Sequence, residues 1–309
     1  MESLRGRDFI SLKDFSPEEL WYLLETAKNL KVQRKRGVDT PHLKGKTLGM
    51  IFTKASTRTR VSFEVGMYQL GGYALFLSAE ATQIKRGEPI ADTARVLSRY
   101  LDGIMIRTFK HQDVLDLAAE ADIPVINGLT DLLHPCQALA DMLTVYEKKG
   151  KLRGVKIAYI GDGNNVAHSL LYAAAKFGME ITVASPSHYL PAEEVVKEAR
   201  MIAAQTQGEI VITSDPQRAA KDAEVIYTDV WASMGQETER EERIKAFQGY
   251  QVNTDLLKVA APGAIIMHCL PAHRGEEITE EVFEGEQSVV FDQAENRLHL
   301  QKAILASIL

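Results

Sequence analysis

Short apolar runs alternate with helical patterns along almost the whole chain, and this alternation constrains the fold more than any other feature. The predicted strands of the first half are 46–53, 73–77, 103–107 and 124–126. The predicted helices around them are 16–36, 61–70, 91–100, 112–121 and 134–149. Repeated strand–helix units form parallel sheets with helices on their faces. The first half is therefore expected to be of the α/β class, with a mainly parallel sheet.

The second half repeats this pattern after a polar, glycine-containing joint at 148–151. Its predicted strands are 155–160, 181–184, 209–213, 225–228, 264–267 and 288–291, and a last helix runs from about residue 295 to the C-terminus. A chain of 309 residues suggests two domains of ordinary size. We therefore expect two α/β domains, residues 1–149 and 150–294.

Composition and charge exclude several classes of function. The formal net charge of -6 argues against a surface for nucleic acid or anionic membrane. No apolar segment approaches the roughly 20 residues that span a bilayer, and the first residues lack the apolar run of a signal peptide. A cytoplasmic protein is expected. Cys136 and Cys269 lie far apart in the sequence, and we expect no structural disulfide between them.

The segment Ser56-Thr57-Arg58-Thr59-Arg60 lies between a predicted strand and a predicted helix. Such a turn offers free backbone N–H groups and the positive end of the helix dipole, which together attract anions. The hydroxyl groups add donors, and an arginine fork suits phosphate. The alternative is a Ser/Thr helix cap with a solvated basic first turn, but that leaves the two arginines unexplained. The segment therefore predicts a phosphate site.

Two further polar features belong to the same edge of the predicted sheet. Arg107 ends a strand, and His134-Pro135-Cys136-Gln137 opens a helix. Ligands of parallel sheets bind beyond the carboxyl ends of the strands, where these features and the Ser56 turn all lie. Pro135 favours an extended His134, which would aim His134 and Gln137 outward. The alternative for His134 is a role as a helix cap.

The turn Gly161-x-Gly163 in the second half is a weak dinucleotide signal. Val166 stands where a third glycine would be, and the next strand ends in Ala184-Ser185 without an acidic residue for a ribose. A nicotinamide-dependent dehydrogenase remains the alternative from another class of enzyme. We favour a tight turn that brings Asn164 and Asn165 to the ligand edge, and we expect no cofactor.

Two segments that follow later strands carry the remaining candidate chemistry. Asp229, Ser233 and a glycine turn suit a ligand with an amino group, although a solvated loop anchored by Trp231 is equally compatible. Cys269, in His268-Cys269-Leu270-Pro271, is either a nucleophile or thiolate base, or a small core residue. The spacing of the histidines and cysteine matches no standard zinc pattern, and no acidic residue lies close by in the sequence. No metal is expected.

Taken together, these motifs resemble the aspartate/ornithine carbamoyltransferase superfamily over essentially the whole chain. The matching positions are Ser56 to Arg60, Arg107, His134-Pro135-x-Gln137 and Arg297. The ornithine branch is the most similar, on the segments Asp229-x-Trp231-x-Ser233-Met234-Gly235-x-Glu237 and His268-Cys269-Leu270-Pro271. The resemblance implies transfer of a carbamoyl group from carbamoyl phosphate to the δ-amine of L-ornithine, giving L-citrulline and phosphate in arginine metabolism.

The resemblance also implies roles for individual residues. The first domain, joined by a C-terminal helix of about 295–309 that packs back on it, would bind carbamoyl phosphate. Its contacts would come from Ser56, Thr57, Arg58, Thr59, Arg107, His134, Gln137 and Arg297, from Cys269 and Leu270, and from Gln83 of a neighbouring subunit. The second domain would bind ornithine through Asn165, Asp229, Ser233 and Met234. The implied catalytic residues are Arg107, His134, Asp229 and Cys269.

Several alternatives stay open within this resemblance. Other members of the superfamily use aspartate, putrescine or acylated ornithine as the amine acceptor. A catalytically inactive regulatory subunit is a third possibility, against which the intact motifs argue. The ornithine pattern implies a homotrimer, or a larger assembly of trimers, with sites at subunit boundaries. The direction of flux is left open, because both directions use the same residues.

Overall fold

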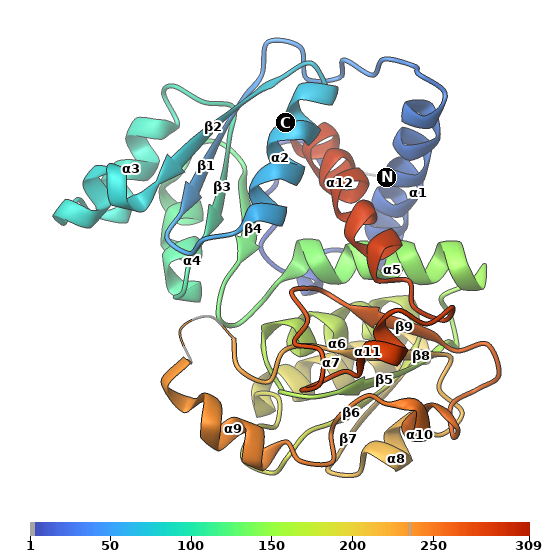
Figure 1. Cartoon of the computed structure of the whole chain (residues 1–309). Helices are drawn as coiled ribbons and strands as arrows, with labels where there is room; N and C mark the ends of the chain where they lie inside the picture. Colours follow the sequence, from blue (N-terminus) through green and yellow to red (C-terminus); the bar gives the residue numbers. More distant parts are fainter. Residues whose placement is uncertain (1–3, 234, 236) are drawn as a thin grey trace. The chain divides into compact units, whose positions relative to one another are not determined.

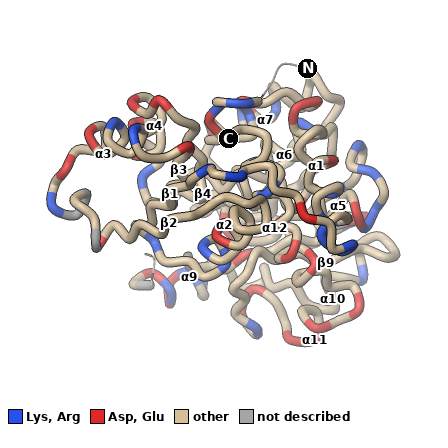
Figure 2. The backbone as a smooth tube through the Cα atoms, turned by 90° about the horizontal axis from the view of Figure 1, so that it is seen from above, with Lys and Arg blue, Asp and Glu red and all other residues tan. Residues whose placement is uncertain are grey.

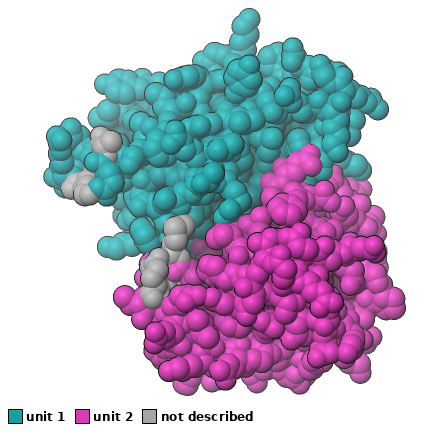
Figure 3. Space-filling model, viewed as in Figure 1, with its two compact units in different colours: residues 1–143, 296–309 teal, residues 144–295 magenta. Residues whose placement is uncertain are grey.

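Two parallel sheets organise the chain in the computed structural model, which describes residues 4–233, 235 and 237–309. The chain divides into unit 1, residues Met1–Leu143 with Asn296–Leu309, and unit 2, residues Thr144–Glu295 (Figure 3). Each unit contains one of the sheets (Figure 1). The fold class predicted from the strand–helix alternation is confirmed.

The sheet of unit 1 has the strand order β2-β1-β3-β4, and its strands pair in parallel. The strands are β1 (Thr47–Phe52), β2 (Tyr73–Ser78), β3 (Gly103–Arg107) and β4 (Val125–Leu129). The order reverses between β1 and β3, so the segments that leave these two strands diverge to opposite sides of the sheet. A ligand of such a sheet binds at this reversal, outside the carboxyl ends of the strands.

Helices cover both faces of the sheet of unit 1 (Figure 1). They are α1 (Pro17–Lys35), α2 (Thr57–Gln69), α3 (Ile90–Leu97), α4 (His111–Glu120), the first part of α5 (Pro135–Lys149), and the short 3₁₀ turns η1 (Leu12–Asp14), η2 (Ala79–Ala81) and η3 (Gln83–Arg86). Helices α3 and α4 lie side by side with charges of both signs, and Arg95 pairs with Glu120 at 2.6 Å (Figure 2). Val114 of α4 packs with Ile51 of β1 and Ile104 of β3 in one apolar core.

The C-terminal helix α12 (Val290–Ile308) packs on unit 1 through residues 296–308, as the sequence analysis predicted. Lys31 of α1 donates to the side chain of Asn296 at 2.6 Å, and Lys302 donates to Gln69 of α2 at 3.0 Å. Gly66 of α2 faces this helix, and a Cβ there would be in ordinary contact with the Lys302 side chain at 3.4 Å. Helices α2 and α12 are therefore packed at van der Waals distance along this contact.

The sheet of unit 2 has the order β7-β6-β5-β8-β9 and is also parallel. The strands are β5 (Lys156–Ile160), β6 (Glu180–Ala184), β7 (Glu209–Thr213), β8 (Val225–Thr228) and β9 (Ile265–His268). The helices are α6 (Asn165–Phe177), α7 (Glu193–Thr206), α8 (Pro216–Ala220), η4 (Glu237–Glu239), α9 (Arg240–Ala246), α10 (Thr254–Leu257) and α11 (Glu280–Phe283). The order reverses between β5 and β8, which marks the ligand edge of this unit.

One predicted strand is wrong. The apolar run 288–291 makes only an isolated bridge, in which Ser288 pairs with Ile266. Helix α12 begins at Val290, five residues before the predicted start near residue 295. An apolar run of four residues fits a buried helix start as well as a strand, and here the chain has to turn into α12. Among the described residues, no helix is long and apolar enough to cross a membrane.

Candidate functional site

The predicted phosphate turn is the N-terminus of α2. Ser56 caps the helix, and its hydroxyl accepts a hydrogen bond from the backbone N–H of Thr59 at 3.2 Å. The first turn of α2 contains no acidic residue, so the positive end of the helix dipole is not neutralised locally. Thr57 is exposed and Arg58 half-buried at this turn. The Ser56 helix cap that was the alternative interpretation is therefore present. Thr57, Arg58 and Thr59 follow it in the first turn of α2, at the positive end of the helix dipole.

Arg60 does not belong to this cluster. Its Nε donates to Glu64, one turn along α2, at 3.0 Å, and its guanidinium lies over the ring of Phe76 at 3.8 Å from the centroid. The contacts with Glu64 and Phe76 therefore explain the second arginine of the motif without a ligand.

Arg297 joins two of the predicted donor residues inside unit 1. One guanidinium nitrogen donates to the hydroxyl of Thr59 at 2.8 Å, and the other donates to Oε1 of Gln137 at 2.7 Å. Gln137 in turn donates to Asp141 at 2.8 Å. Thr59, Gln137 and Arg297 are 4% exposed or less. Three segments far apart in the sequence thus meet in one buried hydrogen-bonded group.

His134 precedes the first residue of α5, and the backbone N–H groups of Gln137 and Ala138 donate to its carbonyl oxygen. The side chain is buried at 3% exposure. Burial lowers the pKa of His134 well below its usual value, and nearby positive charges lower it further. In decreasing order of effect, these charges belong to Arg297, Arg107, Arg58 and Lys54. A neutral histidine therefore lies among cations, as suits a site for an anionic ligand.

Arg107 completes the cluster from the end of β3. It is 6% exposed, and its register partner on β1 is Phe52, three residues before Ala55 and four before the cap of α2. Its carbonyl accepts from the backbone N–H of Thr53 at 3.0 Å. The two strands at the reversal of the sheet thus present Arg107 and the Ser56 turn at one edge.

A hollow of about 690 Å³ adjoins this turn in unit 1. Ser56 and Thr57 line it together with residues of α2 and of β2, including Arg60, Glu64 and Phe76. The other predicted donor residue of this unit, Gln83, is exposed on η3. The hydrogen bonds of Arg297 described above go to Thr59 and Gln137, and the role of Gln83 toward a neighbouring subunit stays a prediction.

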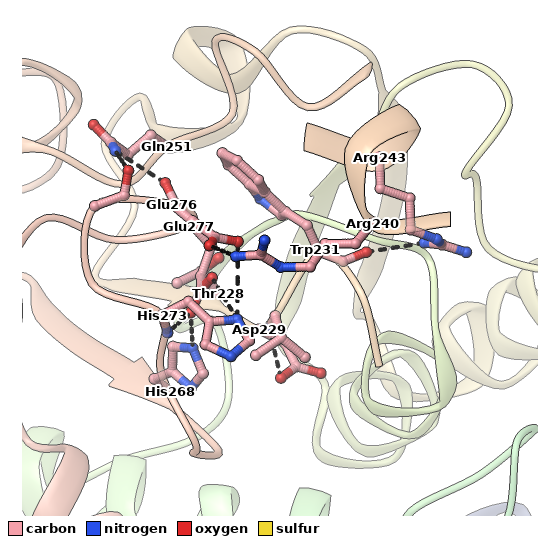
Figure 4. Close-up of polar contacts among 12 residues, drawn as sticks. Thr228, Asp229, Trp231, Arg240, Arg243, Gln251, His268, His273, Glu276 and Glu277 are labelled. Atoms are coloured by element: carbon pink, nitrogen blue, oxygen red, sulfur yellow. Dashed lines mark hydrogen bonds and ion pairs between the residues drawn. The ribbon is translucent and has the colours of Figure 1, made fainter. Parts of the chain in front are cut away.

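Asp229 is the centre of the predicted acceptor site in unit 2 (Figure 4). It follows β8 and is 5% exposed. The thiol of Cys269, which follows β9, donates to its Oδ1 at 3.0 Å. The backbone N–H of Val230 donates to the same oxygen at 2.8 Å. The structure thus brings together two predicted catalytic residues that are 40 positions apart in the sequence.

Asn164 was absent from the predicted ornithine residues, although its turn was singled out. Its Nδ2 donates to Oδ2 of Asp229 at 2.8 Å. Its Oδ1 caps α6 by accepting from the backbone N–H of Val166 at 2.9 Å, and the hydroxyl of Tyr159 lies 3.3 Å away. Only the strand order, which places β5 beside β8, brings this amide to Asp229. The Gly161-x-Gly163 turn was the one signal in the sequence.

The other predicted acceptor residues are placed less closely. Asn165 is half-buried as the first residue of α6, and Ser233 is half-buried in the loop after β8. Met234 lies outside the described residues. Arg243 of α9 fixes the loop after β8, because its guanidinium donates to Asp162 and to the carbonyl of Trp231, both at 3.0 Å. Trp231 anchors the loop by stacking on the Phe247 ring, as its alternative interpretation predicted.

One reason for expecting no metal was that no acidic residue lies close to Cys269 in the sequence, and the structure corrects this reason. No acidic residue lies near it in sequence, but Asp229 lies near it in space, and ligand atoms of Asp229, His268 and Cys269 are all within 4.8 Å of one another. A second such group is His273, Glu276 and Glu277. Both oxygens of Asp229 already accept hydrogen bonds from Cys269 and Asn164. This arrangement suits a general base or an amine ligand.

The two cysteines differ in chemistry and form no disulfide. Cys136 is fully buried in α5, and burial raises the pKa of its thiol to about 12, so it is not a nucleophile at neutral pH. Cys269 is half-buried. The residue after β6, Ser185, uses its hydroxyl to donate to the carbonyl of Gly161 at 2.6 Å. Dinucleotide-binding folds use an acidic residue at this position to bind the ribose hydroxyls. Here the position is Ser185, whose hydroxyl is already hydrogen-bonded to Gly161.

Comparison with known proteins gives matches over nearly the whole chain. Residues 7–147 match the family model "Aspartate/ornithine carbamoyltransferase, carbamoyl-P binding domain". Residues 153–308 match "Aspartate/ornithine carbamoyltransferase, Asp/Orn binding domain". The chain is 60% identical to the ornithine carbamoyltransferase of Pyrococcus abyssi, over 99% of this chain and 97% of the relative. It is 59% identical to the anabolic ornithine carbamoyltransferase of Pyrococcus furiosus, over 99% of this chain and 98% of the relative.

Solved structures give the same result. The ornithine carbamoyltransferase from Pyrococcus furiosus superposes with a TM-score of 0.97 at 59% identity, covering 100% of this chain and 98% of that one. The anabolic ornithine carbamoyltransferase from Campylobacter jejuni gives a TM-score of 0.91 at 43% identity, covering 97% of each chain.

Proposed function

The chain belongs to the aspartate/ornithine carbamoyltransferase family, and we propose that the residues assembled above divide its reaction between donor and acceptor substrates. Its activity is ornithine carbamoyl transfer: carbamoyl phosphate and L-ornithine give L-citrulline and phosphate, a step of arginine biosynthesis. The ornithine nitrogen forms a bond to the carbamoyl carbon, the bond from that carbon to the phosphate oxygen breaks, and the amine loses a proton. The residues must therefore bind a dianion, stabilise an oxyanion and receive an amine.

We assign the phosphate of the donor to the N-terminus of α2 in unit 1. Ser56, Thr57, Arg58 and Thr59 supply hydroxyl, backbone and guanidinium donors there, and Arg107 adds a second fork. The observation that carries this assignment is the buried His134 among four cationic side chains. Cations kept so close together repel one another unless an anion lies among them.

The same cluster suits the carbonyl group of the donor. Arg107, neutral His134 and the hydroxyl of Thr59 are fixed donors, and charge develops on that carbonyl oxygen in the tetrahedral intermediate. Thr59 already accepts from Arg297, so its hydroxyl is oriented and can donate its own proton. Oε1 of Gln137 keeps a second lone pair for the carbamoyl N–H beside its bond from Arg297. Cys269 and Leu270 are assigned to the carbamoyl group as well.

Ornithine is assigned to unit 2. Its δ-amine must be neutral to attack, whereas a free alkyl amine of this kind has a pKa near 10.4. Asp229 and Cys269 are therefore assigned to that amine, to orient it and to help remove its proton. The Asn164 amide and the Val230 backbone hold Asp229 in place. Asn165, Ser233 and Met234 are assigned to the α-amino and carboxylate end.

We further propose the wider organisation that the family resemblance suggests. Residues 1–149 with about 295–309 form the carbamoyl phosphate-binding domain, and residues 150–294 form the ornithine-binding domain. Three copies assemble in the cytoplasm, and each lends Gln83 to the donor site of its neighbour. The exposed side chains of Tyr68 and Tyr73, at 81% and 66%, support an interface along α2 and the edge strand β2. A measured mass of one or two chains in solution would contradict the trimer.

An acceptor panel tests the function. Carbamoyl phosphate is incubated with ornithine, aspartate, putrescine or acetylornithine, and both phosphate release and the carbamoylated product are measured. Citrulline formation with ornithine, at a far higher kcat/KM than any other acceptor gives, is expected. Absence of citrulline would overturn the assignment, and a better rate with another acceptor would move the chain to a different branch of the family.

A further inference from the structure

A buried hydrogen-bonded pair, His268 and Glu277, flanks the backbone that carries Cys269. His268 is the last residue of β9, and both side chains are 0% exposed. Nε2 of His268 lies 3.0 Å from Oε1 of Glu277 (Figure 4). The mechanism above uses neither residue. Burying polar side chains costs free energy unless they are hydrogen-bonded, and here each side chain is hydrogen-bonded to the other.

The other ring nitrogen of His268 holds the loop itself. The backbone N–H of Leu270 donates to Nδ1 at 2.9 Å. Nδ1 is therefore the acceptor, and the ring proton is on Nε2, where Glu277 accepts it. Leu270 has a φ of +61°, in the left-handed region that a residue with a side chain rarely adopts unless surrounding contacts hold it there. The bond to Nδ1 is such a contact.

Glu277 closes the loop from its other end. The oxygen that faces His268 also accepts from the backbone N–H of His273 at 2.6 Å. The carbonyl of Glu277 accepts from Val252 at 2.8 Å, which ties the glutamate to the rest of unit 2. One carboxylate oxygen thus joins both ends of the segment 268–273, which contains Cys269 and Leu270.

We propose that His268 and Glu277 are positioning residues for ornithine use. Glu277 fixes the Nε2–H form of His268, and the acceptor Nδ1 then fixes the Leu270 backbone. The fixed backbone holds the thiol of Cys269 at 3.0 Å from Asp229. The link to ornithine rests on the proposed function, in which Cys269 and Asp229 face the attacking amine.

Two matched pairs of substitutions separate this role from simple packing. In His268→Asn, the side-chain oxygen replaces Nδ1 and can still accept from Leu270, whereas His268→Gln reaches Glu277 instead and loses the Leu270 contact. Glu277→Gln retains an oxygen acceptor for the histidine proton, whereas Glu277→Met has a similar length and removes it. The first member of each pair should preserve the loop, and the second should release it.

The reactivity of Cys269 provides a readout that is independent of activity. The chain contains two cysteines, and Cys136 is 0% exposed, so alkylation of the native protein by iodoacetamide reports Cys269. Released loops open more often, so His268→Gln and Glu277→Met should change the labelling rate by about tenfold or more. His268→Asn and Glu277→Gln should stay within about threefold of the unsubstituted protein.

Kinetics provides the second readout. His268→Gln and Glu277→Met should lower kcat/KM for ornithine by about tenfold to a hundredfold, as misplaced catalytic groups do. Inhibition by the product phosphate, which we assign to unit 1, should not change. Tyr172→Phe is the control for lost stability, because it removes a hydrogen bond from α6 to Glu198 of α7 outside this loop. It should leave labelling and ornithine kinetics unchanged.

The outcomes decide separately on the positioning role and on the function. If the two histidine variants behave alike, or all four variants behave as Tyr172→Phe does, the positioning role is wrong. If His268→Gln does not fold, the glutamate pair carries the same comparison. If the unsubstituted protein forms no citrulline, the proposed function fails. The labelling rates alone then confirm or reject the claim that His268 and Glu277 fix the segment 268–273.

Discussion

The guanidinium of Arg297 donates to the hydroxyl of Thr59 at 2.8 Å, although 238 positions separate them in the sequence. A second nitrogen of the same fork donates to Gln137 at 2.7 Å. Thr59 belongs to the first turn of α2 and Gln137 to the first turn of α5, so Arg297 joins the two helix starts that we assign to carbamoyl phosphate. A residue of the last helix thereby orients groups that follow β1 and β4.

Arg297→Lys tests this joint. Lysine keeps the charge but cannot supply two fixed donors to Thr59 and Gln137 at once. The loss of one hydrogen bond to a charged group amounts to about 1.5–3 kcal/mol. We expect kcat/KM for carbamoyl phosphate to fall at least tenfold, while KM for ornithine changes little. An unaltered kcat/KM for carbamoyl phosphate would show that the fork is only structural.

The two arginines of the α2 motif should behave differently. Arg58→Ala removes a guanidinium that we assign to the phosphate, so binding of carbamoyl phosphate should weaken by several kcal/mol. Arg60→Ala is the matched control on the same helix, because Arg60 pairs with Glu64 in an exposed position that contributes less than about 1 kcal/mol. Steady-state kinetics of both variants checks the difference. Equal losses would mean that the motif works as one basic patch.

Asn164 serves two roles that substitution can separate. Asn164→Ser keeps a helix cap but loses the amide that holds Asp229, so ornithine kinetics should worsen while the unfolding midpoint is nearly retained. Asn164→Ala loses both, with a further cost of about 1 kcal/mol in stability. Denaturant unfolding beside ornithine saturation curves measures the two effects. Normal ornithine kinetics in the serine variant would remove Asn164 from the site.

His134 predicts a dependence of stability on pH. Its pKa in the folded chain lies well below the usual value of 6.5, because of burial first and positive neighbours second. Below that usual value the unfolded chain binds a proton that the folded chain excludes, so stability is complete above it and falls as the pH decreases. Relative to His134→Asn, the unsubstituted protein should lose stability as the pH falls from 7.5 to 5, which denaturant unfolding at each pH measures. If the free energy of unfolding depends on pH in the same way in both proteins, the prediction is contradicted.

Much of the fold follows from local patterns. Ser16, Pro17 and Glu19 predict the start of α1, and the structure has the complete capping box there. The strand–helix alternation predicts parallel sheets, and the ends of parallel strands meet at one edge. Arg107, His134 and the Ser56 turn could therefore be assigned to one edge from the sequence alone. The end of a strand is recognised from the local sequence, without knowing which strands are neighbours in the sheet.

The features that sequence patterns missed all depend on packing between distant segments. Neighbouring residues cannot reveal that Asn164 holds Asp229, since the order of β5 and β8 decides it. The separation of Arg58 from Arg60 depends on Glu64 and Phe76. The start of α12 was misplaced because a short apolar run suits a strand and a buried helix equally. The periodicity of apolar residues identifies helices and strands, whereas the order of the strands decides which distant residues are in contact.

The most direct test of the central claim, that the phosphate and the ornithine amine are bound by separate residue sets, is calorimetric titration with inorganic phosphate. Cys269→Ala removes the thiol that donates to Asp229, and Arg58→Ala removes a guanidinium from the donor cluster. Phosphate should bind Cys269→Ala with the affinity of the unsubstituted protein, while ornithine use by that variant falls. Arg58→Ala should bind phosphate at least tenfold more weakly. Weaker phosphate binding by Cys269→Ala than by Arg58→Ala would contradict the account.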